Sequence, residues 1–154
     1  MIRIADTLRP ERIRLNLTAS TVPEAIRETA LLLRSASAVL YWEDFYSSVI
    51  KNAPCITESD GSFALCLPHA RTDAVSSMVM SIGISTLGVP SESCSQRIRY
   101  FFCIGVPKAL ASDYLRIVGL LVRLLKDIRA ESALHAAPTP AEVIDILSEL
   151  EFRL

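Results

Sequence analysis

One short stretch of the chain gathers the side chains that could take part in chemistry. His69 follows Pro68 and the apolar run of residues 63–67, and residues 71–73 add a cation, a hydroxyl and a carboxylate. Neutral imidazole is a competent nucleophile or base near pH 7. The stretch therefore fits either a reactive site or an ordinary strand-end turn, in which the histidine is exposed and the charges are solvated.

The elements around this stretch explain why His69 is a candidate. Residues 63–67 predict a buried strand, and we expect Pro68 to end it because proline has no N–H to give to a sheet ladder. A histidine just past the C-terminal end of a buried strand lies where open α/β sheets bind their ligands. Apolar patterning predicts further strands at residues 13–17, 78–87 and 98–104.

Helices are predicted from capping signals and from apolar residues at helical spacing. Thr21 and Thr139 each precede a first-turn proline and a glutamate three residues later, which is a capping box. We expect Ser112 to cap a long helix. Residues 51–62 are predicted to be a loop, and shorter helical segments are predicted within residues 2–8, 43–50 and 128–136. Strands mixed with helices indicate a layered α/β domain.

The composition narrows the class of protein. The chain has 154 residues, of which 51% are hydrophobic, enough for one domain with a real core. Its formal net charge of −1 lacks the basic excess that nucleic acid or anionic lipid would need. The N-terminus is charged at once, and the apolar runs are too short to span a bilayer. We therefore expect a cytoplasmic protein with no nucleic-acid partner and no membrane insertion.

The four cysteines do not form a metal-binding pattern. Cys55, Cys66, Cys94 and Cys103 contain no Cys-Xaa-Xaa-Cys pair and have no ligand spacing to either histidine. A structural zinc site is therefore not expected. Cys66 and Cys103 lie within apolar strands and are predicted to be small core residues. All four are expected to be reduced thiols, in keeping with a cytoplasmic protein.

The order of elements and the Pro68–His69 motif together resemble a known family. The chain is similar to the type 2 EIIA domain of the bacterial phosphoenolpyruvate-dependent sugar phosphotransferase system, the fructose, mannitol and nitrogen-regulatory family. The resemblance covers essentially the whole chain. Its anchors are residues 8–13, the helix with Ala25 and Leu33, and residues 65–71, 101–107 and 133–143.

The resemblance carries expectations about fold and partners. It implies one domain over residues 1–154, built on a single mixed, mostly parallel five-stranded sheet with helices on both faces. It implies that His69 is a phosphoryl acceptor, charged by an HPr-like phosphocarrier protein. The phosphoryl group would then pass to an EIIB domain or act as a signal on a regulated target protein, as in nitrogen regulation. No cofactor or metal is implied.

Several positions bear on how the phosphoryl group would be held. The family's arginine in the loop before the histidine strand is replaced by Ala53, and its second active-site histidine by Tyr114. Ser59 stands near a family threonine and is a candidate hydroxyl donor. Arg71 or Lys51 is a candidate substitute for the missing cation.

Three functional hypotheses follow from this pattern. The first is an active phosphocarrier in which His69 is the acceptor and Ser59 and Arg71 support the phosphate. The second is a regulatory protein-binding module, descended from such a carrier, with little or no phosphoryl transfer. The third retains His69 for packing alone. His135, among alanines on a short helix, is predicted to be a packed or surface histidine in all three.

Overall fold

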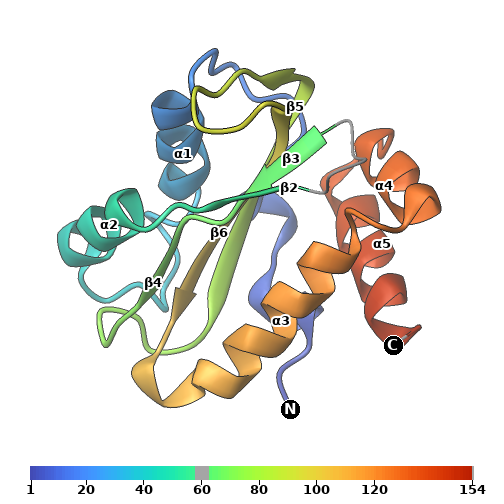
Figure 1. Cartoon of the computed structure of the whole chain (residues 1–154). Coiled ribbons are helices and arrows are strands. Elements are labelled where there is room, and N and C mark those ends of the chain that lie inside the picture. The colour runs from blue at the N-terminus through green and yellow to red at the C-terminus, as the bar shows by residue number, and fades with distance from the viewer. Residues whose placement is uncertain (58–62, 154) are drawn as a thin grey trace.

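The computed structural model describes residues 1–57 and 63–153, and a single open sheet runs through their centre (Figure 1). The strand order is β1-β5-β6-β3-β2, with β4 also paired to β6. The strands are β1 (Ile13–Arg14), β2 (Cys55–Thr57), β3 (Phe63–Cys66), β4 (His69–Arg71), β5 (Val79–Val89) and β6 (Arg97–Val106).

The strand directions confirm a mixed sheet. β6 runs parallel to β3 and β4 and antiparallel to β5, and β1 is parallel to β5. β2 is antiparallel to β3 and ends the strand order. Three of the five pairings are therefore parallel, as the resemblance implied.

β3 and β4 behave as one strand interrupted at a proline. Cys66 pairs with Phe101 and His69 with Ile104, so the register advances by the same amount on both strands. Pro68 interrupts the ladder because it has no N–H, yet its carbonyl still accepts a hydrogen bond of 2.9 Å from the Ile104 amide. β3 thus ends before Pro68, as expected, but His69 begins a further strand, β4, so the expectation of a strand-end turn at His69 was wrong.

Helices cover both faces of the sheet. α1 and α2 pack on one face, and α3, α4 and α5 on the other (Figure 1). No helix within the described residues is long and apolar enough to cross a lipid bilayer. The helices are α1 (Val22–Leu31), α2 (Trp42–Lys51), α3 (Ala111–Arg123), α4 (Ile128–His135) and α5 (Pro140–Phe152). Short 3-10 turns lie at Ile4–Thr7, Pro10–Arg12 and Lys108–Leu110.

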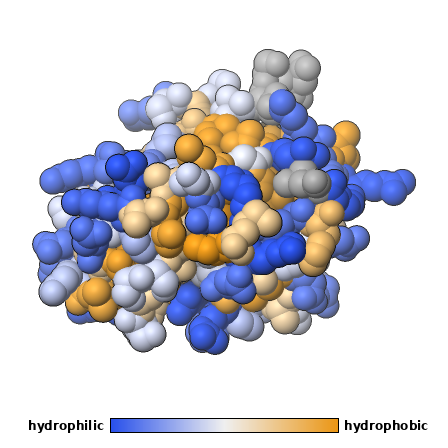
Figure 2. Space-filling model, turned by 90° about the horizontal axis from the view of Figure 1, so that it is seen from below, coloured by the Kyte–Doolittle hydropathy of each residue, from blue (hydrophilic) through white to orange (hydrophobic). Residues whose placement is uncertain are grey.

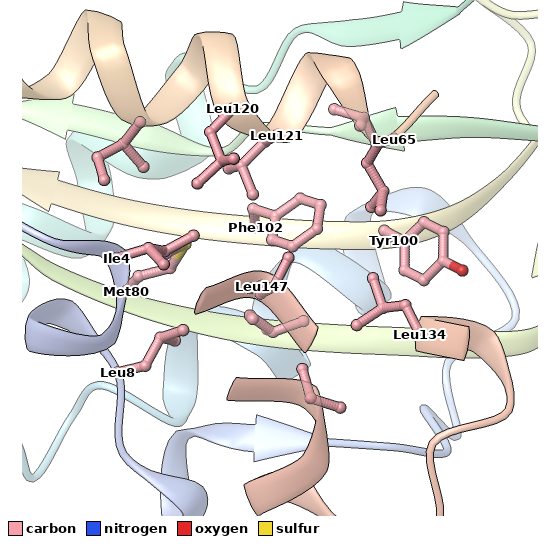
Figure 3. Close-up of a cluster of buried hydrophobic side chains, with 14 of the residues drawn as sticks. Ile4, Leu8, Leu65, Met80, Tyr100, Phe102, Leu120, Leu121, Leu134 and Leu147 are labelled. Carbon is pink, nitrogen blue, oxygen red and sulfur yellow. The ribbon is translucent and has the colours of Figure 1, made fainter. Parts of the chain in front are cut away.

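The central strand β6 is buried on both faces, which explains why its sequence is almost continuously apolar. Tyr100, Phe102 and Ile104 join the core cluster under α3 to α5, part of which is drawn in Figure 3. The alternate residues Phe101 and Cys103 join the cluster under α1 and α2. A strand buried on both faces needs apolar side chains at successive positions. Each such side chain stabilises the fold by roughly 1.5–3 kcal/mol when fully buried.

Gly105 permits a close approach near the end of β6. A Cβ at this position would lie 2.7 Å from Cε1 of Phe45 on α2. The glycine therefore lets α2 settle against β6 beside β4, since Gly105 pairs with Ala70. Through this contact the position of α2 is set relative to the strand that carries His69.

The N-terminal caps of the helices were predicted better than the lengths of the elements. The Thr21 and Thr139 side chains accept hydrogen bonds from the amides three residues later, which is the threonine half of each predicted capping box. Ser112 does not cap α3, because the helix already begins at Ala111. The strand expected at residues 13–17 is present only as β1, over two residues.

One buried carboxylate joins the two ends of the fold. Both oxygens of Glu151 in α5 accept from the amide of Ile4, at 3.2 and 3.3 Å. The same side chain pairs with Arg116 of α3 at 2.7 Å. A buried carboxylate costs free energy unless it is paired and hydrogen-bonded. These three contacts satisfy it and fix the first 3-10 turn against α3 and α5.

Two of the four cysteines depart from the expectation. Cys66 and Cys103 are buried free thiols, as predicted. Cys55 and Cys94 are joined in a disulfide, so the expectation of four reduced thiols was wrong. The pairing is a tertiary contact between β2 and the loop before β6, 39 residues apart in sequence, and no local pattern encodes it.

Candidate functional site

His69 is held at the start of β4 by backbone contacts on both sides. It pairs with Ile104 of β6. On the other side its amide donates to the carbonyl of Asn52, which ends α2, at 2.8 Å. The side chain is only partly buried. The histidine is thus fixed in the sheet by its backbone while its ring reaches the surface.

A hydrogen bond determines which ring nitrogen of His69 is available. Nδ1 lies 2.8 Å from the carbonyl oxygen of Leu67. A carbonyl can only accept, so Nδ1 must carry the proton. In the neutral ring the lone pair is then on Nε2, which is the nucleophilic nitrogen. The local backbone therefore selects the tautomer and leaves the lone pair on the other ring nitrogen.

Tyr114 forms one wall of the histidine site. Its ring stacks on the imidazole with centroids 5.4 Å apart and planes inclined by 30°. Tyr114 lies in the first turns of α3, so the positive end of that helix dipole is close to the ring. Burial raises the pKa of the half-buried Tyr114 phenol, which keeps it a neutral O–H donor.

Arg71 is the cationic residue nearest to His69 in the sequence, and both lie in β4. It ends β4 two residues after His69, and the two side chains alternate with the buried Ala70. Residues i and i+2 of a strand share a face, so Arg71 and His69 face the same side. Lys51, the last residue of α2, is exposed. Ser59 lies outside the described residues.

Residues 52–57, which we call the edge segment, run antiparallel to β3 and reach the first residue of β4. We call β4 the histidine strand. Cys55 pairs with Cys66, and the carbonyl of Pro54 accepts from the amide of Leu67 at 2.9 Å. Ala53 packs against the apolar cluster under α1 and α2, and its carbonyl accepts from the Cys66 thiol at 3.7 Å. Asn52 and Leu67 contact His69 through their carbonyls, and no side-chain pattern could have revealed this.

His135 lies at the end of α4, in another neighbourhood. Its ring meets Tyr100 edge-on at 6.4 Å, and the nearby Arg99 and Glu131 form an ion pair. Burial, followed by the positive charge of Arg99, lowers the pKa of His135. Within residues 1–57 and 63–153, no cluster of three or more His, Cys, Asp or Glu side chains could hold a metal ion.

The two helices that border His69 carry exposed apolar side chains. Figure 2 views the molecule from below Figure 1, and hydrophobic and hydrophilic residues are mixed on that face. On the two helices that border His69, Ile50 of α2 and Leu115 of α3 are exposed at 44% and 67%. A partly apolar surface of this kind suits a protein partner better than a small polar ligand.

The family of the chain follows from a match over nearly its whole length. A family model described as "Phosphoenolpyruvate-dependent sugar phosphotransferase system, EIIA 2" matches residues 6–150. The chain belongs to this EIIA type 2 family. The match includes β3, β4 and α3, so the elements around His69 are part of the family fold.

Individual EIIA relatives agree with this assignment. The chain is 32% identical over 89 residues to the PTS system fructose-specific EIIA component of Haloferax volcanii, across 57% of this chain and 58% of that protein. The chain therefore aligns with a little over half the length of that relative.

Solved EIIA structures share the fold. The nitrogen regulatory protein IIA-Ntr of Neisseria meningitidis superposes with a TM-score of 0.77 at 18% identity, covering 94% of this chain and 98% of that one. Enzyme IIA-mannitol of Escherichia coli, in its complex with phosphorylated enzyme IIB-mannitol, gives 0.70 at 21% identity, covering 92% and 97%. The mixed sheet with helices on both faces is thus the EIIA type 2 fold.

Proposed function

We propose that this protein carries a phosphoryl group on Nε2 of His69. The observation that supports this most directly is the hydrogen bond from Nδ1 to the Leu67 carbonyl, which places the lone pair of the neutral ring on Nε2 in a partly buried side chain. In the family context the donor is an HPr-like phosphocarrier protein. The acceptor is an EIIB domain or, in a regulatory role, the phosphorylated state itself is the signal.

The transfer that we propose is an in-line displacement between two histidines. The Nε2 lone pair of His69 attacks the phosphorus of the donor's phosphohistidine, and a new N–P bond forms as the donor's N–P bond breaks. The electron pair of the broken bond returns to the donor's ring. The proton on Nδ1 stays bonded to Leu67, so His69 needs no separate base.

The phosphorylated ring would carry nearly two negative charges that need stabilisation. Arg71 lies on the same face of β4 and is the candidate guanidinium. The phenol of Tyr114 and the first turn of α3 supply a neutral donor and a favourable dipole beside the ring. Ser59 remains a candidate hydroxyl donor from the family pattern.

Intact mass spectrometry tests this function. The protein is incubated with phosphoenolpyruvate, enzyme I and HPr, and one phosphate is expected to add to wild type. The adduct should be labile in acid, as phosphohistidine is. Omission of HPr is the matched control, and it should leave the mass unchanged. An unmodified wild type under conditions that charge another EIIA protein would contradict the proposal.

A second function is favoured by the residue at position 53. Ala53 supplies no guanidinium and packs against the cluster under α1 and α2. The same fold could then act as a regulatory module that binds a target protein with little or no phosphoryl transfer. Its signature is equal affinity of wild type and His69→Ala for the target, with no mass gain in either protein.

A further inference from the structure

The four cysteines form two chemically different pairs. Burial raises the pKa of Cys66 and of Cys103 to about 12, so these thiols stay protonated and unreactive near pH 7. Cys55 and Cys94 are only partly buried and are joined in a disulfide. Thiol–disulfide exchange requires access of a thiolate to a sulfur atom. Of the two pairs, only the partly buried Cys55 and Cys94 meet that condition.

One end of the disulfide lies in the edge segment, which contacts the histidine strand. Cys55 is the first residue of β2 and lies in the edge segment. In the same segment, Pro54 accepts from the amide of Leu67 and Asn52 from the amide of His69. Cys55 is therefore one residue from the carbonyl that bonds Leu67 and three residues from the carbonyl that bonds His69.

Without the disulfide, few contacts would hold the edge segment in place. β2 has three residues and lies at the end of the strand order, so its ladder bonds are on one side only. Short edge strands open locally at low free energy. Cys94 lies in the loop before β6, the strand that also pairs with β4. The disulfide thus ties the edge segment to the central strand of the sheet.

We propose that the Cys55–Cys94 disulfide is a reversible redox switch on the His69 site. In the oxidised protein it holds the edge segment against the histidine strand, and reduction releases that segment. The oxidised site is then the more preorganised and accepts phosphoryl groups faster. The effect on phosphoryl transfer rests on the proposed function, whereas the effect on the edge segment does not.

The two directions of the switch need different reagents. A dithiol reductant of the thioredoxin class attacks one sulfur, expels the other as a thiolate and then resolves the mixed disulfide, delivering two electrons and two protons. For reoxidation, a hydroperoxide takes one thiolate to a sulfenic acid and leaves as water or an alcohol. The partner thiol displaces hydroxide from the sulfenic acid, which forms the S–S bond and releases water.

Hydrogen exchange tests the structural half of the switch without any phosphoryl donor. Wild type is compared with and without dithiothreitol, and the oxidised form is first checked by a non-reducing peptide map for the Cys55–Cys94 link. The amides of Leu67 and His69 are expected to exchange about tenfold or more faster after reduction, as expected when a local segment is released. Equal exchange in the two states would overturn the switch.

Phosphorylation rates test the functional half. Oxidised wild type is expected to accept phosphate from HPr severalfold faster than the reduced protein. Cys94→Ser should behave as reduced wild type under both conditions, and Cys66→Ala should still respond to dithiothreitol. Equal nonzero rates in the two states would overturn the switch. No phosphorylation in either state, with redox-dependent exchange, would instead contradict the proposed function and leave the redox release of the edge segment standing.

Discussion

The two histidines of this chain lie in neighbourhoods that treat an imidazole in opposite ways. At His69, Nδ1 donates a hydrogen bond to the backbone carbonyl of Leu67, and the partly buried side chain stacks on Tyr114. At His135 the ring meets Tyr100 edge-on and Nδ1 is buried with no hydrogen-bond partner among the described residues.

The difference shows what prepares a histidine for chemistry. A carbonyl that fixes the Nδ1 proton orients the ring and leaves a free lone pair on the other nitrogen. At His135 burial and the positive charge of Arg99 lower the pKa, and Nδ1 has no hydrogen-bond partner among the described residues to fix its proton. We therefore expect phosphate at His69 and a purely structural role for His135.

The most decisive test removes each ring in turn. His69→Ala should abolish phosphate uptake completely, because no other side chain supplies the acceptor nitrogen. His135→Ala should retain it at the wild-type rate. Intact mass after incubation with phosphoenolpyruvate, enzyme I and HPr measures both, and thermal unfolding checks that each variant is folded. Uptake that persists in His69→Ala would reverse the comparison.

Loss of the neighbouring cation should have the next largest effect. Hydrogen bonds to charged groups contribute about 1.5–3 kcal/mol. Arg71→Ala is therefore expected to slow phosphoryl acceptance on the order of ten- to a hundredfold. Arg71→Lys is the matched control and should recover part of the rate, as a point charge without the guanidinium fork. Single-turnover kinetics with phosphorylated HPr gives the rates, and an unchanged Arg71→Ala would show that another cation holds the phosphate.

Restoring a guanidinium at position 53 should act in the opposite direction. Ala53→Arg is expected to speed acceptance by about tenfold, the lower end of what a charged hydrogen bond supplies. Ala53 packs toward α1 and α2, so the longer side chain must turn around the edge segment to reach the ring. Ala53→Gln is a control of similar length without charge. If both variants react at the wild-type rate, the packing at position 53 keeps the guanidinium away.

Tyr114 should contribute a smaller amount through its stacked ring. Tyr114→Ala removes the wall beside the imidazole and is expected to slow acceptance severalfold, since an aromatic contact contributes about 0.5–1.5 kcal/mol. Tyr114→Phe keeps the ring and isolates the hydroxyl. A Phe variant as slow as the Ala variant would assign the whole effect to the phenol O–H rather than to stacking.

The smallest expected effect is a pH dependence of stability at His135. Its folded pKa is lowered by burial and by Arg99. The unfolded chain then binds the proton more readily, so the free energy of unfolding should fall as pH drops below about 6.5 through the folded pKa. Urea unfolding at several pH values measures this. His135→Gln should show a flatter profile over that window, and identical profiles would exclude a contribution from His135.

The sequence predicted best what is encoded locally. Thr21 and Thr139 cap their helices because a cap needs only the next three residues. The continuous apolar run of β6 was also predictable, because burial on both faces leaves a pattern, whereas the mixed sheet was implied by the family resemblance. The position of His69 near a strand end was correct in outline, but the sheet continues past Pro68.

The missed features are those set by tertiary contacts. β2 was predicted as loop, because Asn52 and Pro54 are typical turn residues and the ladder with β3 overrides their preference. The Cys55–Cys94 bond joins segments 39 residues apart. The Leu67 carbonyl that fixes the His69 tautomer is a backbone group, and residue types alone do not predict such a contact.

The Glu151 contacts also have a topological consequence. By bonding the amide of Ile4 across 147 positions of sequence, this carboxylate makes the path of the chain almost a closed loop. In such a loop the order of elements along the polypeptide is separable from their arrangement in space. A circular permutant that links Ile4 to the end of α5 and opens at a surface turn is expected to keep β4 and α3 side by side. The histidine site thus belongs to the architecture of the sheet rather than to the linear order of the sequence.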